Sequence, residues 1–189
     1  MSKIRLSYSL MSSIKYGRRD DVVRQYLRMP SEVNENMKRG LDFDKMVEAE
    51  VDAKKQFPIE FNSLKLVAPQ CKLQATVEYN ELFSIKGELD VWDLPAIYEV
   101  KNSITKDSAE YSDTGQLDIY FLLSELVPKD HPLSKADRAW LYRFDPVHRT
   151  YDTSLIWKSQ RRIQAARDMV EEYGPQVYEI LKSEGIIND

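Results

Sequence analysis

Two carboxylates and one lysine lie close together in the middle of the sequence, at Asp90, Glu99 and Lys101. Asp90 comes late in one stretch rich in apolar and β-branched residues, and Glu99 and Lys101 are two residues apart in the next such stretch. Side chains two apart in a strand point to the same face of a sheet. A turn at residues 94–95 would fold the second strand back beside the first. The sequence therefore predicts that two carboxylates and one ammonium group converge.

Hydrolysis of a phosphodiester bond uses this combination of side chains. Carboxylate oxygens bind a hard divalent cation, the cation activates water and neutralises charge that develops at phosphorus, and a lysine stabilises the attacking water or the scissile phosphate. Ile97 and Val100 make the strand around Glu99 apolar, where an inward charge without a function would be costly. The alternative interpretation is a cross-strand ion pair without catalytic function.

A helix is predicted after these strands, and it adds two polar side chains. Gln116 lies fifteen residues after Lys101, and Tyr120 lies four residues after Gln116, which places both side chains on one helical face. In order and spacing, three motifs resemble those of the PD-(D/E)XK nuclease superfamily: Gly87-Glu88-Leu89-Asp90, Glu99-Val100-Lys101 and Gln116-x-x-x-Tyr120. The resemblance is strongest to the RecB-like branch, which includes nucleases of CRISPR adaptation and several phage and viral exonucleases.

Two N-terminal motifs extend the resemblance to this branch. Leu6-Ser7-Tyr8-Ser9 is similar to the opening of the branch, where a Ser-Tyr-Ser run leads into helices. Gly40-Leu41-Asp42-Phe43-Asp44 is similar to its Gly-x-x-x-His motif, with Asp44 in place of the histidine. A carboxylate at this position favours an all-oxygen, Mg²⁺-like site over one with imidazole.

The resemblance implies a fold, an activity and a set of site residues. The implied fold is α/β, with a restriction-endonuclease-like mixed central sheet flanked by helices and an N-terminal helical lobe. The implied activity is that of a metal-dependent deoxyribonuclease that uses Mg²⁺ or Mn²⁺. The implied metal ligands are Asp44, Asp90, Glu99 and the carbonyl group of Val100. The implied catalytic residues are Asp90, Glu99, Lys101, Gln116 and Tyr120, of which the last two would brace the site and the DNA backbone.

The charge distribution is uneven along the chain. The 27 Lys and Arg residues and 31 Asp and Glu residues give a net charge of −4, which argues against a protein that coats nucleic acid by bulk positive charge. Residues 1–45 carry ten basic and six acidic side chains, whereas residues 46–133 carry eight and sixteen. An acidic centre that approaches phosphates needs cations, either metal ions or neighbouring Lys and Arg side chains. Chance surface composition is the alternative explanation.

The basic residues of the N-terminal region suggest how DNA would bind. They are Lys15, Arg18, Arg19, Arg24 and Arg28. In the RecB-like branch this region arches over the active site, so the resemblance implies that DNA threads beneath it, with Arg18, Arg19 and Tyr120 as contacts. Threading requires a free end or a single strand. We therefore expect an exonuclease that acts, without sequence specificity, on single-stranded or end-containing DNA.

Two other functions remain open at this point. The same fold with weak or no hydrolysis could serve as a module that binds DNA or a partner protein. Alternatively, the motifs could be fortuitous ion pairs in a structural interaction protein. A homo-oligomer is compatible with each of these functions.

Several classes of protein are excluded by composition. Cys71 is the only cysteine, which rules out an intrachain disulfide and an iron-sulfur cluster held by four thiolates of one chain. The iron-sulfur members of the branch have a cysteine near position 15 or 16 and three near the C-terminus, and this sequence has none at those places. No apolar stretch approaches the roughly 18 residues that a membrane helix needs, and the N-terminus lacks the apolar core of a signal peptide. We expect a cytoplasmic protein without a membrane contact.

The 189 residues are expected to form a single nuclease domain. Residues 1–57 would form the helical lobe and the first core helix, and residues 58–189 the sheet core with two further helices. Apolar spacing predicts two short helices between Leu6 and Pro30, broken near Gly17, and a longer helix from Ser31 to about Gln56 with Ser31 as its N-cap. Gly40 lies inside that helix at a cost of about 1 kcal/mol, which predicts close backbone packing there.

Alternating and β-branched patterns predict most of the sheet. Strands are predicted at residues 64–68, 72–79, 82–92, 96–102, 139–144 and 151–157, and helices at 108–126 and 159–183. Helices, antiparallel strands, a helix, further strands and a last helix follow one another in this order. This order indicates an α/β domain with a mixed central sheet.

Overall fold

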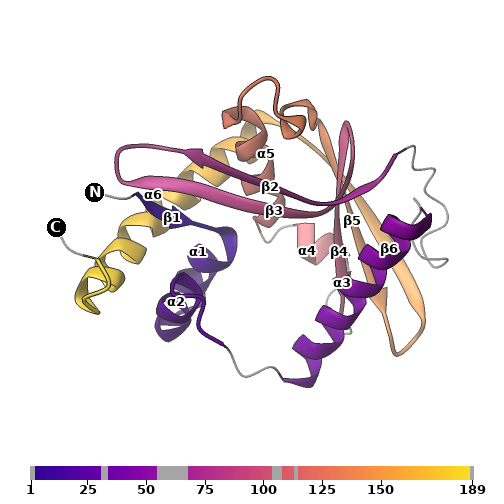
Figure 1. Ribbon diagram of the computed structural model, residues 1–189, viewed down its shortest axis with the longest axis horizontal. Helices are drawn as coiled ribbons and strands as arrows, with labels where there is room; N and C mark the ends of the chain where they lie inside the picture. Colours follow the sequence, from indigo (N-terminus) through magenta and orange to yellow (C-terminus); the bar gives the residue numbers. More distant parts are fainter. Residues whose placement is uncertain (1–2, 31–33, 55–67, 104–107, 113–114, 188–189) are drawn as a thin grey trace.

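The computed structural model describes residues 3–30, 34–54, 68–103, 108–112 and 115–187. In this part of the chain six strands form one mixed sheet (Figure 1). They are β1 (Ile4–Leu6), β2 (Gln70–Glu78), β3 (Phe83–Asp93), β4 (Ala96–Asn102), β5 (Arg138–Asp145) and β6 (Thr150–Trp157). The order is β1-β3-β4-β5-β6, and β2 pairs with β3. Two pairs, β1 with β3 and β4 with β5, are parallel, and the others are antiparallel.

Helices flank this sheet, which confirms the predicted α/β class with a mixed central sheet. They are α1 (Tyr8–Lys15), α2 (Arg19–Tyr26), α3 (Glu35–Lys54), α4 (Ser108–Ser112), α5 (Gln116–Leu126) and α6 (Gln160–Ser183), with a 3₁₀ turn at Pro132–Lys135. The predicted last helix is confirmed as α6, whose N-cap Ser159 accepts a hydrogen bond from the backbone N–H of Arg162 at 3.4 Å. No helix among the described residues is long and apolar enough to cross a bilayer.

Two separate hydrophobic cores fix the positions of the helices. The larger core joins α1, α5 and α6 to the sheet, and it includes the fully buried Leu6, Ile85 and Phe121. The smaller core lies under α3, where Val47 and Val51 pack with residues of β3, β4 and β5. Phe43 of α3 stacks on Phe144 of β5 with ring centroids 5.4 Å apart. The sheet between these cores is therefore held by α3 on the one side and by α5 and α6 on the other.

The lobe formed by α1 and α2 is fixed to the body of the protein. Both helices pack against α6, the long C-terminal helix (Figure 1). Ser7 caps α1 by accepting a hydrogen bond from the backbone N–H of Leu10 at 3.3 Å. Gln25 of α2 donates a hydrogen bond to the buried hydroxyl of Ser13 at 3.0 Å, which joins the two helices. These contacts give the lobe a definite position beside the sheet.

The structure corrects three local predictions. Leu6 was expected in a helix but belongs to β1, because it pairs with Ile85 and alternates with the exposed Arg5. The single helix predicted over 108–126 is two helices, since Gly115 adopts φ +89° just before α5 begins. Gly40 has no close neighbour, because a Cβ atom there would meet nothing within 4 Å. Close packing is therefore not the reason for this glycine.

Two predictions lie outside the described residues. They are the N-cap role of Ser31 and most of the strand at 64–68. In the described part α3 begins at Glu35, and the side chain of Asn34 accepts a hydrogen bond from the backbone N–H of Met37 at 2.9 Å. This is the geometry of an N-cap.

Candidate active site

The hairpin of β3 and β4 brings the central carboxylates and lysine together. The backbone N–H of Val100 donates a hydrogen bond to Oδ2 of Asp90 at 3.0 Å, which ties the two strands at this point. Lys101 Nζ forms an ion pair with Oε1 of Glu99, its neighbour two residues away on the same strand. The structure thus places Asp90, Glu99 and Lys101 in one site, as the period-2 argument predicted.

Glu99 is the most deeply buried carboxylate of this group, with only 1 % of its surface exposed. Its Oε2 atom is buried and has no hydrogen-bond partner among the described residues. A buried carboxylate oxygen without a partner is costly. Such an atom is free to accept a ligand that the structure does not contain.

Helix α5 supplies Gln116 and Tyr120 to the same site. Gln116 Nε2 donates a hydrogen bond to the Tyr120 hydroxyl at 2.9 Å, and this hydroxyl donates to the backbone carbonyl of Glu88 at 2.7 Å. The helix approaches β3 closely at Gly87, where a Cβ atom would lie 2.5 Å from Leu123 Cδ1 and 3.1 Å from the Tyr120 ring. Gly87 therefore permits the contact that connects α5 to the strand carrying Asp90.

Asp44 of α3 reaches the site from the opposite side of the hairpin. A small cavity of about 10 Å³, roughly the space of one water molecule, is lined by Asp44, Glu48, Asp90 and Val100. Glu48 forms an ion pair with Lys72 at 3.0 Å. Asp44 and Asp90 also line the larger cleft that contains Glu99 and Lys101. All four metal ligands expected from the sequence therefore lie at this junction of α3, β3 and β4.

The carboxylates of the site repel one another and lose hydration. Burial raises the pKa of Glu99 to about 7, and the negative charge of Asp90 adds to the rise. Burial, followed by the charge of Asp90, raises the pKa of Asp44 to about 6. Burial also raises the pKa of Asp90, against the opposing effects of Lys101 and of the Val100 N–H group. Three neighbouring acids with raised pKa values are typical of a functional site.

The ammonium group of Lys101 is held in its charged form. Burial alone would lower its pKa, but the carboxylates of Glu99 and Asp90 outweigh burial and raise it. A lysine that stays protonated can donate hydrogen bonds and positive charge, but it cannot act as a general base. This assigns an electrostatic role to Lys101 in any chemistry of the site.

A cleft of about 360 Å³ runs from these residues to the N-terminal lobe. Its far wall is formed by α1 and α2, which contribute Tyr8 and Tyr26 among others. Besides Lys101, three cationic side chains line it: Arg5 of β1, Arg28 just after α2, and Lys86 of β3. None of the three forms an ion pair with another described residue. The cleft thus has an acidic end and three further cations that form no ion pair with a described residue.

The structure does not bring Arg18 or Arg19 into this cleft. Arg18 lies 3.8 Å from the carboxylate of Asp21 and packs over the ring of Tyr16. Arg19 donates a hydrogen bond to the Ser183 hydroxyl at 2.7 Å, at the end of α6. Neither side chain is among the residues that line the cleft.

Arg5 and Lys86 line the cleft, but the sequence analysis did not predict either of them as a site residue. Lys86, Glu88 and Asp90 are spaced by two along β3 and all line the cleft, so the period of the strand already contained the signal for Lys86. Arg5 pairs with Ser84 across the parallel β1–β3 contact, two residues from Lys86. A three-residue strand gives too short an alternation to be recognised, and Arg5 had no comparable signal.

The oxygen atoms of the expected metal ligands are chemically suited to a hard divalent cation, although they are not already arranged around one. All are oxygen atoms, which suits Mg²⁺ or Mn²⁺, and Glu99 Oε2 has no partner among the described residues. Within the described ranges, however, no three Asp, Glu, His or Cys side chains form a ready-made ligand group. The other oxygen of Glu99 is occupied by Lys101.

Comparison with solved structures finds this fold in exonucleases. The structure is similar to a putative exonuclease from Eubacterium rectale, with a TM-score of 0.63, 16% sequence identity, and coverage of 96% of this chain and 82% of that chain. It is similar to a phage-related exonuclease from Haemophilus somnus (TM-score 0.53, 15% identity, 97% and 96% coverage). An alkaline exonuclease from Laribacter hongkongensis also matches (TM-score 0.50, 14% identity, 96% and 93% coverage).

These similarities establish the fold, which this chain shares with the three exonuclease structures. No model of a known protein family matches the sequence, and no curated protein matches it significantly. At 14–16% identity the likeness extends to the fold alone. The function must therefore be argued from the site.

Proposed function

We propose that this chain is a metal-dependent deoxyribonuclease of the PD-(D/E)XK superfamily, related to its RecB-like branch. The observation that carries the proposal is the meeting of Asp90, Glu99 and Lys101 at the acidic end of a cleft that is also lined by three further cations. Carboxylates for a metal ion, an ammonium group, and cations for phosphates together suit metal-dependent hydrolysis of a phosphodiester. The exonuclease fold supports this assignment by analogy.

The site residues fall into three roles in this proposal: metal binding, charge stabilisation and support of the strand. Asp44, Asp90, Glu99 and the Val100 carbonyl would hold Mg²⁺ or Mn²⁺. When bound, the ion would supply Lewis acidity at the scissile phosphate and lower the pKa of the attacking water. Lys101 donates hydrogen bonds to the water or to a non-bridging phosphate oxygen and stabilises the charge that develops there. Gln116 and Tyr120 hold the backbone of β3 in place, because the Tyr120 hydroxyl donates to the Glu88 carbonyl.

The cleft supports single-stranded or end-containing DNA as the substrate. Its volume of about 360 Å³ lies between the sheet and the α1–α2 lobe, and the lobe is fixed to α6. A space of this size suits a small ligand or a short stretch of one strand. The cations Arg5, Arg28 and Lys86 would bind its phosphates irrespective of base sequence, and Tyr8 and Tyr26 offer rings on which bases could stack.

The test compares two single-stranded substrates of equal length, one linear and end-labelled and the other covalently closed. We expect degradation of the linear strand in Mg²⁺ or Mn²⁺ and no degradation in EDTA. The closed circle should be cut much more slowly, because it offers no end to enter beneath the lobe. Equal rates for the circle and the linear strand would contradict the exonuclease mode while leaving hydrolysis intact.

A DNA-binding module with weak hydrolysis is the second candidate. The observation in its favour is that no ready-made ligand group is assembled among the described residues, with Glu99 paired to Lys101 instead. Lys101→Ala separates the two functions if DNA cleavage and DNA affinity are measured on the same preparation. A nuclease loses cleavage and keeps most of its affinity, whereas a binding module has little cleavage to lose.

A further inference from the structure

Three helices in the described part of the chain end with the same backbone motif. In each, the residue after the C-cap has a positive φ: Gly17 after α1 (+68°), Arg28 after α2 (+55°) and Gly185 after α6 (+67°). The N–H of this residue donates a hydrogen bond to the carbonyl three residues earlier, and the next N–H donates to the carbonyl five residues before it. This helix ending favours glycine. Helix α2 therefore has an arginine where α1 and α6 have glycine.

The positive φ is the reason for glycine at the other two helix ends. A Cβ atom at Gly17 or at Gly185 would meet nothing within 4 Å, so no close neighbour excludes a side chain there. With a positive φ, however, the Cβ atom of an L-residue is crowded by its own backbone. Arg28 carries this strain, and residues held in such conformations cluster at sites that bind ligands.

Arg28 differs from the two glycines in its location. It lines the cleft, together with Gln25 and Tyr26 from the last turn of α2, whereas neither Gly17 nor Gly185 does. Its guanidinium group forms no ion pair with another described residue. The end of α2 thus presents a cation to the cleft from the lobe, across from the sheet that carries the acidic end.

We propose that Arg28 is a phosphate-binding residue that determines how tightly the cleft holds a DNA strand, and that the fold tolerates backbone strain at the end of α2 to present it. A guanidinium group can donate two parallel hydrogen bonds to one phosphate. The hydrogen-bonded helix ending fixes the backbone from which this side chain projects, so less freedom is lost on binding. The inference rests on the proposed function. It adds that stability and binding conflict at Arg28, which an arginine with only a structural role would not show.

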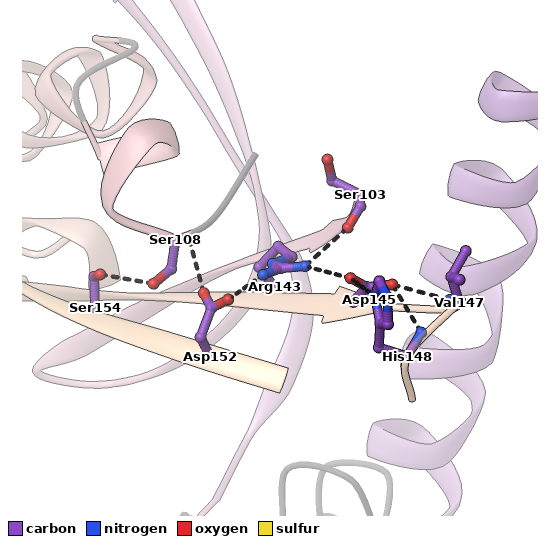
Figure 2. Close-up of polar contacts among 8 residues, drawn as sticks. All are labelled: Ser103, Ser108, Arg143, Asp145, Val147, His148, Asp152 and Ser154. Carbon is purple, nitrogen blue, oxygen red and sulfur yellow. Dashed lines mark hydrogen bonds and ion pairs between the residues drawn. The ribbon is translucent and has the colours of Figure 1, made fainter. Parts of the chain in front are cut away.

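Arg149 provides a matched control outside the cleft. It is exposed and has φ +53°, in the turn between β5 and β6. Asp145 holds this turn, because its carboxylate accepts hydrogen bonds from the backbone N–H groups of Val147 and His148 at 2.9 and 3.1 Å (Figure 2). Arg143 binds the same carboxylate at 3.2 Å. None of these residues lines the cleft, so the positive φ of Arg149 belongs to a hairpin turn alone.

Three variants separate charge, strain and location. Arg28→Gly removes the cation and the strain, Arg28→Ala removes the cation and keeps the strain, and Arg149→Gly removes both outside the cleft. Fluorescence anisotropy of a labelled single-stranded oligothymidylate in EDTA measures affinity without the proposed hydrolysis. We expect both Arg28 variants to bind roughly three- to tenfold more weakly. Their slope of log K against log salt should fall by about 0.7, the value for one phosphate contact of a single strand. Arg149→Gly should bind as the wild type does.

Thermal unfolding of the same variants measures the strain. The Tm of Arg28→Gly should exceed those of the wild type and of Arg28→Ala by about 1–4 °C, because glycine adopts the positive φ without crowding. A Tm of Arg28→Gly at or below that of the wild type would overturn the proposal. It would show that Arg28 supports the helix end instead, as a cation near a helix C-terminus can.

The affinities decide the other half of the proposal. Wild-type affinity in Arg28→Gly would overturn it, and so would an equal loss of affinity in Arg149→Gly. If the wild type binds the strand and Arg28 has no effect, this inference alone fails. A wild type that does not bind the strand would overturn the proposed DNA substrate as well.

Discussion

Glu99 and Lys101 combine burial with charge in a way that an ordinary ion pair on a sheet surface does not. Glu99 is 1% exposed, one of its oxygens is bound to Lys101, and the other has no partner among the described residues. By contrast, Lys3 and Glu78 form an exposed pair at 2.7 Å whose carboxylate side is 79% exposed. Exposed pairs of this kind contribute little to stability. The buried pair therefore calls for a functional explanation, which the proposed hydrolysis would provide.

The first prediction follows from the charge of this pair. Glu99→Gln and Lys101→Ala should each lower DNA cleavage by at least about 10²-fold, because each removes charge needed in the transition state. Single-turnover cleavage at saturating DNA measures this effect apart from binding. Lys3→Ala is the matched control, since it removes a lysine from the exposed pair and should leave the rate unchanged. A few-fold effect in both site variants would contradict the assigned roles.

The second prediction concerns the stability of the metal-free protein. The pKa values of Asp44 and Glu99 are about 6 and about 7 in the folded state, above their ordinary values. Between about pH 4 and 7 the folded state then binds more protons than the unfolded state, so stability falls as pH rises through this range. We expect the Tm in EDTA to decrease from about pH 5 to about pH 7.5, and Glu99→Gln to flatten the decrease. A Tm that rises over this range would show that burial and the charge of Asp90 do not raise the pKa values of these acids.

The glycines of α3 and β3 show which contacts between helices and strands position the site. Gly40 in α3 has open space around its Cα, whereas Gly87 in β3 is in close contact with α5. The same substitution should therefore have opposite effects at the two positions. This difference tests whether the contact between α5 and β3 supports the site.

The third prediction uses these two glycines. Gly40→Ala should raise the free energy of unfolding by about 0.5–1 kcal/mol, because alanine favours the helix and meets no obstacle. Gly87→Ala should lower it by about 1–3 kcal/mol, because the new methyl group displaces Leu123 and the Tyr120 ring. Gly87→Ala should also slow cleavage through the Tyr120 contact to Glu88. Urea unfolding and the cleavage assay check both, and a neutral Gly87→Ala would show that α5 can shift freely.

The sequence predicted those elements whose pattern is local. Asp90, Glu99 and Lys101 could be brought together because strand alternation and one tight turn determine their geometry. Strand β1 was missed because three residues show too little alternation, and its partner β3 lies far away along the chain. Gly115 was visible in the sequence, but only its left-handed backbone shows that it divides the predicted helix. Strand spacing places Glu99 and Lys101 on one face of β4, but it does not show that their side chains form an ion pair.

Across the whole molecule, the path that DNA would take depends on which cationic side chains face the cleft. Although the overall charge is −4, the cationic side chains of Arg5, Arg28 and Lys86 line the cleft. The residues expected from the sequence, Arg18 and Arg19, do not line the cleft, and Arg19 instead binds Ser183 at the end of α6. The two groups of arginine and lysine residues therefore predict different effects on DNA binding.

The fourth prediction compares these groups. The double variant Arg5→Ala with Lys86→Ala should weaken binding of single-stranded DNA, because each side chain would neutralise a phosphate. It should also reduce the slope of log K against log salt by about one for each cation removed. Arg18→Ala with Arg19→Ala is the matched control, and it should have the smaller effect. Fluorescence anisotropy at several salt concentrations measures both. A larger effect of the Arg18 and Arg19 change would place the DNA on the outside of the lobe.

If a divalent metal ion bound at Asp90 makes this cleft hydrolytic, titration of Mn²⁺ into the metal-free protein will reveal a binding site that depends on this carboxylate. Isothermal titration of the wild type and of Asp90→Asn should be paired with cleavage of end-labelled linear DNA by the same preparations. We expect Mn²⁺ binding and Mn²⁺-dependent cleavage in the wild type, and the loss of both in Asp90→Asn. Cleavage that persists in EDTA, or equal binding and cleavage in Asp90→Asn and the wild type, would contradict metal-dependent hydrolysis at Asp90.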